Sequence, residues 1–252
     1  MSALRATLVA APEAFDAGIV EVEGEAYRHL FRARRLAIGE ALRVVDGAGR
    51  ARRGTVESVD RRRATITLGD PLAPREPSRH VELLVGTPRP ERADWLVEKA
   101  TELGASAVRF LATERTLRAL SPARLERLER VARAAVEQCG RARIPALSGV
   151  HAWGELPALL EPWAERWVLT PDGPAGEDGL ASPQDLAVSS GVSRAASGSQ
   201  SCSVCIGPEG GFTADEVAAL RALGCRPARL GSRVLRVETA ALAAVTLLLA
   251  AS

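Results

Sequence analysis

The sequence predicts an α/β protein in two parts, a small N-terminal β-barrel followed by a larger domain built on a parallel sheet. Residues 1–72 show short alternating segments separated by Gly and Asp turns, which is typical of a small barrel. Proline-rich residues Pro71–Pro77 favour an extended boundary. After it, apolar strands alternate with helical patterns, which favours a parallel sheet. We therefore expect a barrel at 1–72, a linker at 73–77 and the larger domain at 78–252.

The N-terminal part contains three alternating segments, at 41–49, 52–60 and 62–70. Asp46-Gly47 is a turn signal, and residues 60–63 are typical of a hairpin end. A short helix is expected to begin at Gly24 and to continue through Leu30, Ala33, Arg34 and Ala37, which recur at helical spacing.

In the larger part, strands and helices are expected to alternate. Gly104 and Gly140 are typical helix stops, Ser121-Pro122 a typical helix start, and Thr213 with Glu216 a capping box. The expected strands are 81–86, 107–111, 166–170, 203–206 and 228–230, and the expected helices are 91–103, 122–139, 213–223 and 237 onward. Trp95, Leu96, Lys99 and Leu103 should share one side of the first helix. Residues 172–201 are rich in small and polar residues and are expected to form a loose surface loop, with a short helix near 183–188.

The charge is unevenly distributed. The formal net charge is only +2, but arginines concentrate in the first 80 residues, and Lys99 is the only lysine. An arginine-rich small domain beside a balanced larger one suggests a polyanionic partner.

Membrane and metal functions are not expected. The N-terminus lacks a signal-peptide pattern, and the apolar C-terminal stretch is too short for a membrane span, so a cytoplasmic protein is expected. Cys202 and Cys205 form a single CxxC without a second pair or a nearby His, which is a poor zinc site. We expect no metal.

Two stretches are the strongest candidates for a site. Residues 206–213 (IGPEGGFT) form a glycine-rich turn between a strand and a capped helix, where open α/β sheets bind ligands. Residues 230–240 (LGSRVLRVETA) place Arg236 and Glu238 just before an apolar helix. A plain structural turn and a helix-start ion pair are the alternative readings of these two stretches.

Taken together, the motifs resemble one family. KATELG at 99–104, TER at 113–115, EQCGR at 137–141 and the two glycine-containing stretches occur in the order seen in the RsmE family. HLFRARRLAIGE at 29–40 and VVDGAGR at 44–50 resemble its N-terminal segment. Val237 stands where a Thr is usual, and Cys139 where a small Ser is usual.

The resemblance implies a fold and an activity. Members are S-adenosylmethionine-dependent methyltransferases of the SPOUT class that modify uridine N3 in 16S ribosomal RNA, here expected within the 30S subunit. The implied fold is an N-terminal PUA-like β-barrel and a C-terminal α/β domain with a trefoil knot, which is a rare exception to chain-threading rules. A homodimer with a shared active site is also implied.

The implied site residues fall into three groups. For catalysis, Arg236 is the first candidate to stabilise a uracil anion, Arg115 and Arg141 come next, and Glu238 either orients Arg236 or accepts a proton. The residues expected around the cofactor are Thr170, Gly207, Pro208, Glu209, Gly210, Gly211, Leu230, Gly231, Val234 and Leu235. The arginines expected to contact RNA phosphates are Arg28, Arg32, Arg34, Arg35, Arg52 and Arg53.

Two other functions remain open on the sequence. One is another SPOUT activity, such as ribose 2′-O methylation or a tRNA target. The other is a non-catalytic RNA-binding protein that has kept the fold.

Overall fold

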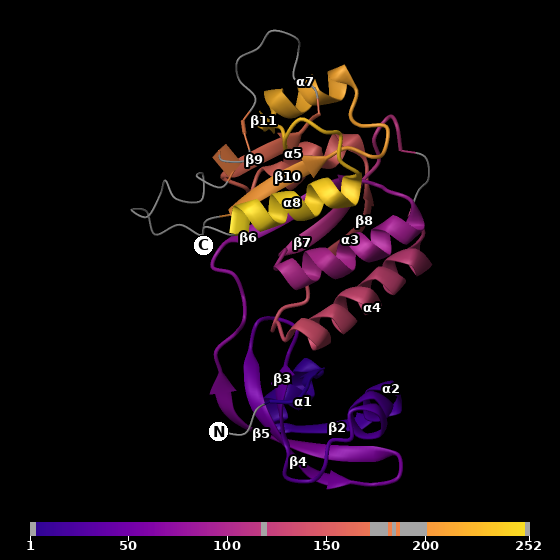
Figure 1. Cartoon of the computed structure of the whole chain (residues 1–252), viewed down its shortest axis with the longest axis vertical. Coiled ribbons are helices and arrows are strands. Elements are labelled where there is room, and N and C mark those ends of the chain that lie inside the picture. Colours follow the sequence, from indigo (N-terminus) through magenta and orange to yellow (C-terminus); the bar gives the residue numbers. More distant parts are fainter. Residues whose placement is uncertain (1–3, 117–119, 172–180, 183–184, 187–200, 250–252) are drawn as a thin grey trace. The chain divides into compact units, whose positions relative to one another are not determined.

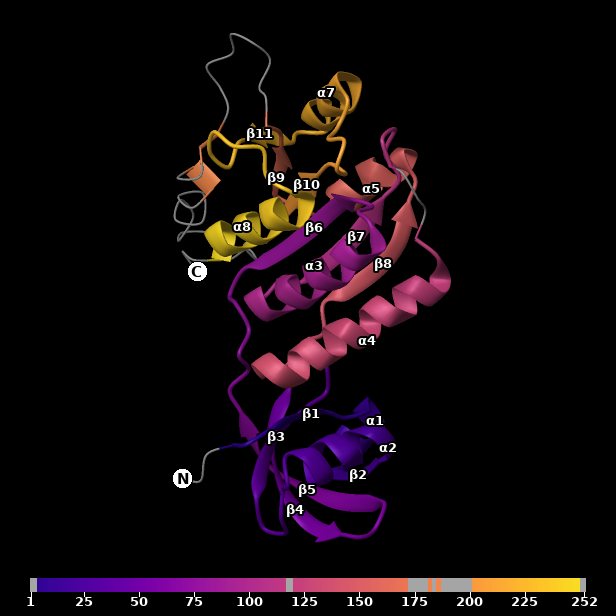
Figure 2. The same cartoon turned by 45° about the vertical axis from the view of Figure 1, so that its right-hand side comes forward.

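The structure is a computed structural model that describes residues 4–116, 120–171, 181–182, 185–186 and 201–249. It divides into two compact units (Figures 1 and 2). The first contains Met1–Glu76 and Arg133–Ile144, and the second contains Pro77–Ala132 and Pro145–Ser252.

The first unit is built on one five-stranded sheet. Its strands lie in the order β1 (Thr7–Val9), β3 (Ala41–Val45), β4 (Ala51–Val59), β5 (Arg63–Leu72) and β2 (Ile19–Glu23). β1 is parallel to β3, and the other neighbours are antiparallel. Register shifts in the β4–β5 pair mark irregularities that bend a sheet.

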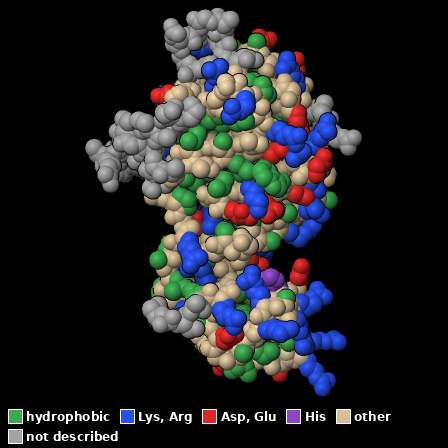
Figure 3. Space-filling view, viewed as in Figure 1, with side chains coloured by type: hydrophobic (Ala, Val, Ile, Leu, Met, Phe, Trp, Pro, Cys, Tyr) green, Lys and Arg blue, Asp and Glu red, His purple; other side chains and the backbone are tan. Residues whose placement is uncertain are grey.

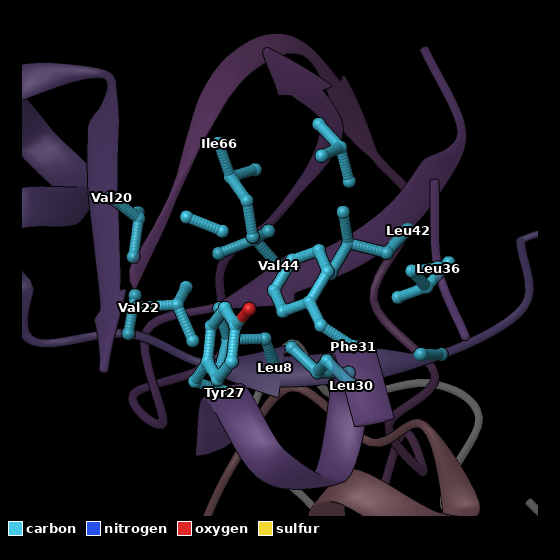
Figure 4. Close-up of a cluster of buried hydrophobic side chains, with 14 of the residues drawn as sticks. Leu8, Val20, Val22, Tyr27, Leu30, Phe31, Leu36, Leu42, Val44 and Ile66 are labelled. Atoms are coloured by element: carbon cyan, nitrogen blue, oxygen red, sulfur yellow. The ribbon is translucent and has the colours of Figure 1, made fainter. Parts of the chain in front are cut away.

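The core of this unit lies between the curved sheet and the helices α1 (Pro12–Ala17) and α2 (Gly24–Tyr27). Figure 4 shows Tyr27, Phe31 and Leu30 pointing toward Val44 and Ile66 of the sheet. The Tyr27 and Phe31 rings stack with their centroids 5.2 Å apart.

The helix that begins at Gly24 is shorter than expected. It continues from α2 into a π-helical turn, η1 (Arg28–Ala33), and ends there. Arg35 has a φ of 56°, a left-handed backbone that a right-handed helix does not contain. Ala37 is exposed, whereas Leu36 is buried beneath the turn. The predicted continuation through Arg34 and Ala37 is therefore wrong.

A segment from much later in the chain completes the first unit. It comprises the last residues of α4 (Pro122–Cys139) and the chain up to Ile144. The guanidinium of Arg133 donates to the Val9 carbonyl at 2.5 Å, and the Glu137 carboxylate accepts from the Val9 N–H at 3.2 Å. A single boundary at residues 73–77, as expected from the sequence, would assign this segment to the second unit instead.

The second unit contains a six-stranded sheet in which every neighbouring pair is parallel. Its order is β11 (Arg226–Ala228), β9 (Glu165–Leu169), β10 (Ser201–Ile206), β6 (His80–Gly86), β7 (Ala107–Leu111) and β8 (Ala146–His151). Four of the expected strands are present within one or two residues of their expected bounds, the one expected at 228–230 lies two residues earlier as β11, and β8 is an additional edge strand.

The direction of the chain reverses at the centre of this sheet. β6, β7 and β8 follow one another outward, and then β9 lies on the other side of β6, with β10 inserted between them. In open parallel sheets, ligands bind beyond the carboxyl ends of the strands at such a switch point. A ligand is therefore expected to bind at the loops that follow β6 and β10.

Helices cover both faces of the sheet. α8 (Val237–Leu249) packs against β6, β10 and α3 (Pro90–Leu103). Leu156 and Leu160 of α5 (Leu156–Leu160) and Leu220 of α7 (Ala214–Ala222) form a cluster with strand residues on the other face.

α3 has a buried face and an exposed face. Ala93, Leu96 and Val97 are fully buried, whereas Trp95 and Leu103 are 43% and 39% exposed. Trp95, Leu96, Lys99 and Leu103 share one side of the helix by their spacing, as expected, but only Leu96 of the four is fully buried.

Most of the expected surface loop at 172–201, and most of the short helix expected at 183–188, lies outside the described residues. Within it, Ala181 forms an isolated bridge with Ala228.

Candidate active site

The glycine-rich turn after β10 is closed tightly on itself. The Gly211 N–H donates to the Pro208 carbonyl at 2.8 Å, and Gly211 has a φ of 70°. A Cβ atom on Gly207 would lie 2.7 Å from the Phe212 nitrogen, so position 207 admits only glycine without rearrangement. Gly207 and Pro208 are buried, while Glu209 and Gly210 are exposed. The backbone at the tip of the turn, at Glu209 and Gly210, is thus accessible from outside.

The turn also lies directly against the end of β6. A Cβ atom on Gly86 would lie 2.5 Å from the Pro208 nitrogen and ring. The loops after β6 and β10 therefore meet at the switch point, as their strand order requires.

The loop between β11 and α8 is open and polar. Gly231 has a φ of 91°, and Val234 is 79% exposed, while Leu230 and Leu235 are half-buried. Within the described part of the chain, the backbone of Gly231–Leu235 makes no hydrogen bond. Backbone N–H and C=O groups need partners, so this segment offers a row of free donors and acceptors to a ligand or to water.

The first turn of α3 holds both of these loops. The Arg89 N–H donates to Oε1 of Glu209 in the glycine-rich turn at 3.0 Å. Arg92 Nη1 lies 3.1 Å from Oε1 of Glu238, at the start of α8. The ion pair of Glu238 is thus with Arg92, not with Arg236 as the sequence suggested.

The loop after β7 reaches the same turn. Arg115 donates from Nη1 to the Gly210 carbonyl at 2.7 Å. Glu216 accepts from the Glu114 N–H at 2.8 Å and from the Thr213 N–H at 2.8 Å, which joins this loop to the start of α7. The capping box predicted from Thr213 and Glu216 is present, and its Glu has a second partner.

The remaining catalytic and cofactor candidates differ in their surroundings. Arg236 is exposed, and among the described residues its guanidinium has neither an ion pair nor a hydrogen bond. Arg141 belongs to the first unit, where it is 4% exposed and its Nη2 lies 2.8 Å from the Glu76 carboxylate. Thr170 follows β9, and its N–H donates to Ala228. The structure therefore gathers the loops of 86–92, 113–116, 207–213 and 230–238 within the second unit.

Three contributors were missed at the sequence level. Gly86 ends a strand without standing out in it, and Arg92 is one arginine among many. Glu216 was recognised as a cap, but its bond to Glu114 joins residues that are 102 positions apart. No local pattern signals any of these contacts.

The arginines of the first unit form an exposed basic surface. Figure 3 shows Lys and Arg side chains projecting from the edge of this unit where α2 lies in Figure 1. Arg28, Arg32, Arg34 and Arg35 are exposed. Arg52 and Arg53 are half-buried, and the Arg52 guanidinium donates to three backbone carbonyls, those of Phe15, Leu68 and Gly69.

The described residues offer neither a metal cluster nor a membrane-crossing helix. No group of three or more His, Cys, Asp or Glu side chains among them is arranged to hold a metal ion. No described helix combines the length and the apolar character that crossing a membrane demands. Burial raises the pKa of the Cys202 thiol to about 12, which favours a structural role for this cysteine.

Comparisons with known proteins agree with this geometry. Residues 74–249 match the RNA methyltransferase domain, and residues 22–69 match the RNA methyltransferase PUA domain. Ribosomal RNA small subunit methyltransferase E of Mycobacterium bovis is 35% identical over 91% of this chain and 86% of its own length. The protein of the same name from Bacillus subtilis is 27% identical over 92% and 90%.

Solved structures give the same result. The ribosomal RNA small subunit methyltransferase E from Neisseria gonorrhoeae, bound to S-adenosylmethionine, superposes with a TM-score of 0.74 at 25% identity over 90% of each chain. A probable rRNA methyltransferase from Porphyromonas gingivalis gives 0.73 at 29% identity over 88% and 90%. The chain belongs to the RsmE family of RNA methyltransferases.

Proposed function

We propose that this protein is an S-adenosylmethionine-dependent methyltransferase that modifies N3 of a uridine in 16S ribosomal RNA. The observation that carries the proposal is the close contact between the loops after β6 and β10, at Gly86 and the glycine-rich turn, which lie at the switch point of the sheet. The relatives of this chain are named ribosomal RNA small subunit methyltransferase E. The PUA domain match and the basic surface of the first unit support an RNA substrate.

The site suits a nucleoside cofactor. The unbonded backbone of Gly231–Leu235 can pair with the edge of an adenine, while Leu230 and Leu235 supply apolar surface. A Cβ atom on Gly211 or Gly231 would meet nothing within 4 Å, so open space lies beside both glycines. When bound, S-adenosylmethionine supplies a methyl group on a sulfonium sulfur. We assign its binding to Gly207–Gly211 and Leu230–Leu235, with Thr170 at the neighbouring strand end.

Methylation at N3 requires the protein to stabilise the uracil anion, because N3 carries a proton at neutral pH. Arg236 is exposed beside the cofactor loop, and its guanidinium has no partner among the described side chains, so it is free to face the uracil oxygens. A fixed positive charge at that place stabilises the negative charge that develops as the proton leaves. Arg115, held over Gly210, is the second cation at the site.

Glu238 and Arg141, which the sequence suggested as catalytic residues, are assigned structural roles instead. The Glu238 carboxylate is 7% exposed and paired with Arg92, which suits holding the start of α8 better than accepting a proton from RNA. Arg141 is paired with Glu76, which also accepts from the N–H groups of Ala142 and Arg143, and this suits a structural role in the first unit.

We also propose the finer features that the resemblance implies. The return of α8 onto β6 and β10, after β11 at the far edge of the sheet, supports a knotted chain. A homodimer through this unit is proposed from the resemblance. The 30S subunit is the proposed substrate particle, which places the enzyme in the cytoplasm.

Nucleoside mass spectrometry tests the proposal. Deleting the gene should remove N3-methyluridine from 16S rRNA, and the purified protein with S-adenosylmethionine should restore it on the 30S subunits of the deletion strain. An unchanged N3-methyluridine content would refute the proposed function. Loss of a 2′-O-methylated or tRNA nucleoside instead would assign another SPOUT activity.

A further inference from the structure

We infer that Arg92, in the first turn of α3, is a positioning residue: it holds Glu238, and through Glu238 it keeps Gly231–Arg236 in the shape that binds the cofactor. The inference rests on the proposed function, because the ligand of this loop is S-adenosylmethionine. It assigns a role to a residue of α3 that lies outside the two glycine-containing loops.

The ion pair itself is the first observation. The Glu238 side chain is 7% exposed, and Arg92 Nη1 lies 3.1 Å from its Oε1. A carboxylate in such a buried place is costly unless a cation or hydrogen-bond donors compensate it. The start of α8 contributes its dipole, and Arg92 contributes the full charge.

The second observation is the rigidity of the element that carries Arg92. Ala93, Leu96 and Val97 anchor α3 with no exposed surface, and α3 packs along α8. The same turn of α3 also holds the other cofactor loop, through the bond from the Arg89 N–H to Glu209. The N-cap residue and the first turn of one anchored helix thus contact both loops of the site.

The third observation is the lack of internal support in the loop. Between Gly231 and Leu235 the described backbone makes no hydrogen bond, so the segment depends on its two ends for its shape. Glu238 lies just beyond the C-terminal end. Loss of Arg92 leaves the Glu238 carboxylate buried without its cation, and the start of α8 and the loop before it are expected to shift.

Calorimetric titration with S-adenosylmethionine, in the absence of RNA, measures the effect directly. We expect Arg92→Ala to weaken binding by about tenfold. This loss lies between those expected from removing one partner of an exposed ion pair and of a buried ion pair. Arg92→Lys should retain most of the affinity, because it keeps the charge. If Arg92 acts through Glu238, the double variant Arg92→Ala/Glu238→Ala should bind no more weakly than Glu238→Ala alone.

Arg127→Ala is the matched control. Arg127 also forms an ion pair with α3, at 3.0 Å from Asp94, but it lies outside the site loops. Its removal should leave cofactor affinity unchanged. Thermal melting of each variant separates a local effect from unfolding. If Arg92→Ala does not fold, Arg92→Gln takes its place, because it removes the charge but keeps a longer side chain, and it too should weaken binding.

The outcomes are distinguishable. Wild-type protein that does not bind S-adenosylmethionine would refute the proposed function itself. Wild-type binding combined with a change of less than about twofold in Arg92→Ala, or in Arg92→Gln where Arg92→Ala does not fold, would overturn the positioning role alone. If the losses of affinity in the two single variants add up in the double variant, Arg92 acts on the site independently of Glu238, which also overturns the inference.

Discussion

Gly86, at the end of β6, lies so close beneath Pro208 that a Cβ atom on it would be 2.5 Å from the Pro208 nitrogen and ring. The two residues are 122 positions apart, and β6 and β10 bring them together as neighbouring parallel strands. This contact joins the end of one central strand to the glycine-rich turn that follows the other.

Gly86→Ala should destabilise the protein and weaken cofactor binding together. The φ of Gly86 is not in the left-handed region, so alanine is forbidden here by the backbone and ring of Pro208 rather than by its own backbone. Overpacking of this kind costs about 1–3 kcal/mol. Chemical denaturation and calorimetry measure the two effects. Gly154→Ala is the control, because nothing lies within 4 Å of its Cβ position, and it should change neither quantity.

Glu216→Ala should lower stability by about 1–2 kcal/mol, because it removes one half of the capping box of α7 and the acceptor of the Glu114 N–H. It should also lower turnover, since the Glu114 N–H bond holds the loop that carries Arg115. Glu216→Gln keeps one acceptor oxygen and should recover part of the stability. Equal stability of Glu216→Ala and Asp215→Ala, at an exposed position in the same turn, would contradict this role.

Arg236→Ala should lower kcat on 30S subunits by roughly 10²–10³-fold, the usual cost of removing one preorganised electrostatic group. Its affinity for S-adenosylmethionine should change little, because the side chain is exposed and holds no part of the cofactor loop. Single-turnover kinetics and calorimetry separate the two quantities. Arg233→Ala, in the same exposed loop, is the comparison variant. Unchanged turnover in Arg236→Ala would remove this residue from the mechanism.

The four cysteines should differ in their reactivity toward a thiol reagent. Cys139 is partly exposed, whereas Cys202, Cys205 and Cys225 are buried. The thiolate is the reactive form, and burial raises the pKa of Cys202 to about 12. A hydrogen bond with Cys225, together with burial, raises the pKa of Cys205 as well. The same hydrogen bond lowers the pKa of Cys225, but burial keeps its thiol away from the reagent. Folded protein at pH 8 should therefore react rapidly only at Cys139, and all four should react in denaturant. Fast labelling of Cys202 in the folded state would contradict its structural role.

The sequence predicts the features that are local in the chain. The alternation of strands and helices in the second unit, and the capping box of Thr213 and Glu216, follow from patterns a few residues long. The tight turn at Gly207 follows from the backbone freedom of glycine. The position of these glycines after a central strand places them at the switch point of the sheet.

The features that escaped prediction depend on tertiary structure. Proximity in sequence suggested that Glu238 pairs with Arg236, but the packing of α3 along α8 brings Arg92 to it instead. The end of η1 depends on the left-handed backbone of Arg35, which an arginine rarely adopts. Trp95 and Leu103 fit an apolar helical pattern, yet the register of α3 on the sheet leaves both exposed.

The arginines of the first unit should separate into two classes when RNA affinity is measured against salt concentration. Arg28, Arg32 and Arg35 are exposed, and their simultaneous replacement by Ala should reduce the slope of log affinity against log salt by about 2, near 0.7 for each lost phosphate contact. Arg52 instead donates to three backbone carbonyls and lies 5.9 Å from the Phe15 ring centroid, so Arg52→Ala should lower the melting temperature and leave the slope unchanged. Filter binding to 30S subunits over a salt series and thermal melting provide the two measurements. A full salt slope in the triple variant would show that this surface does not contact phosphates.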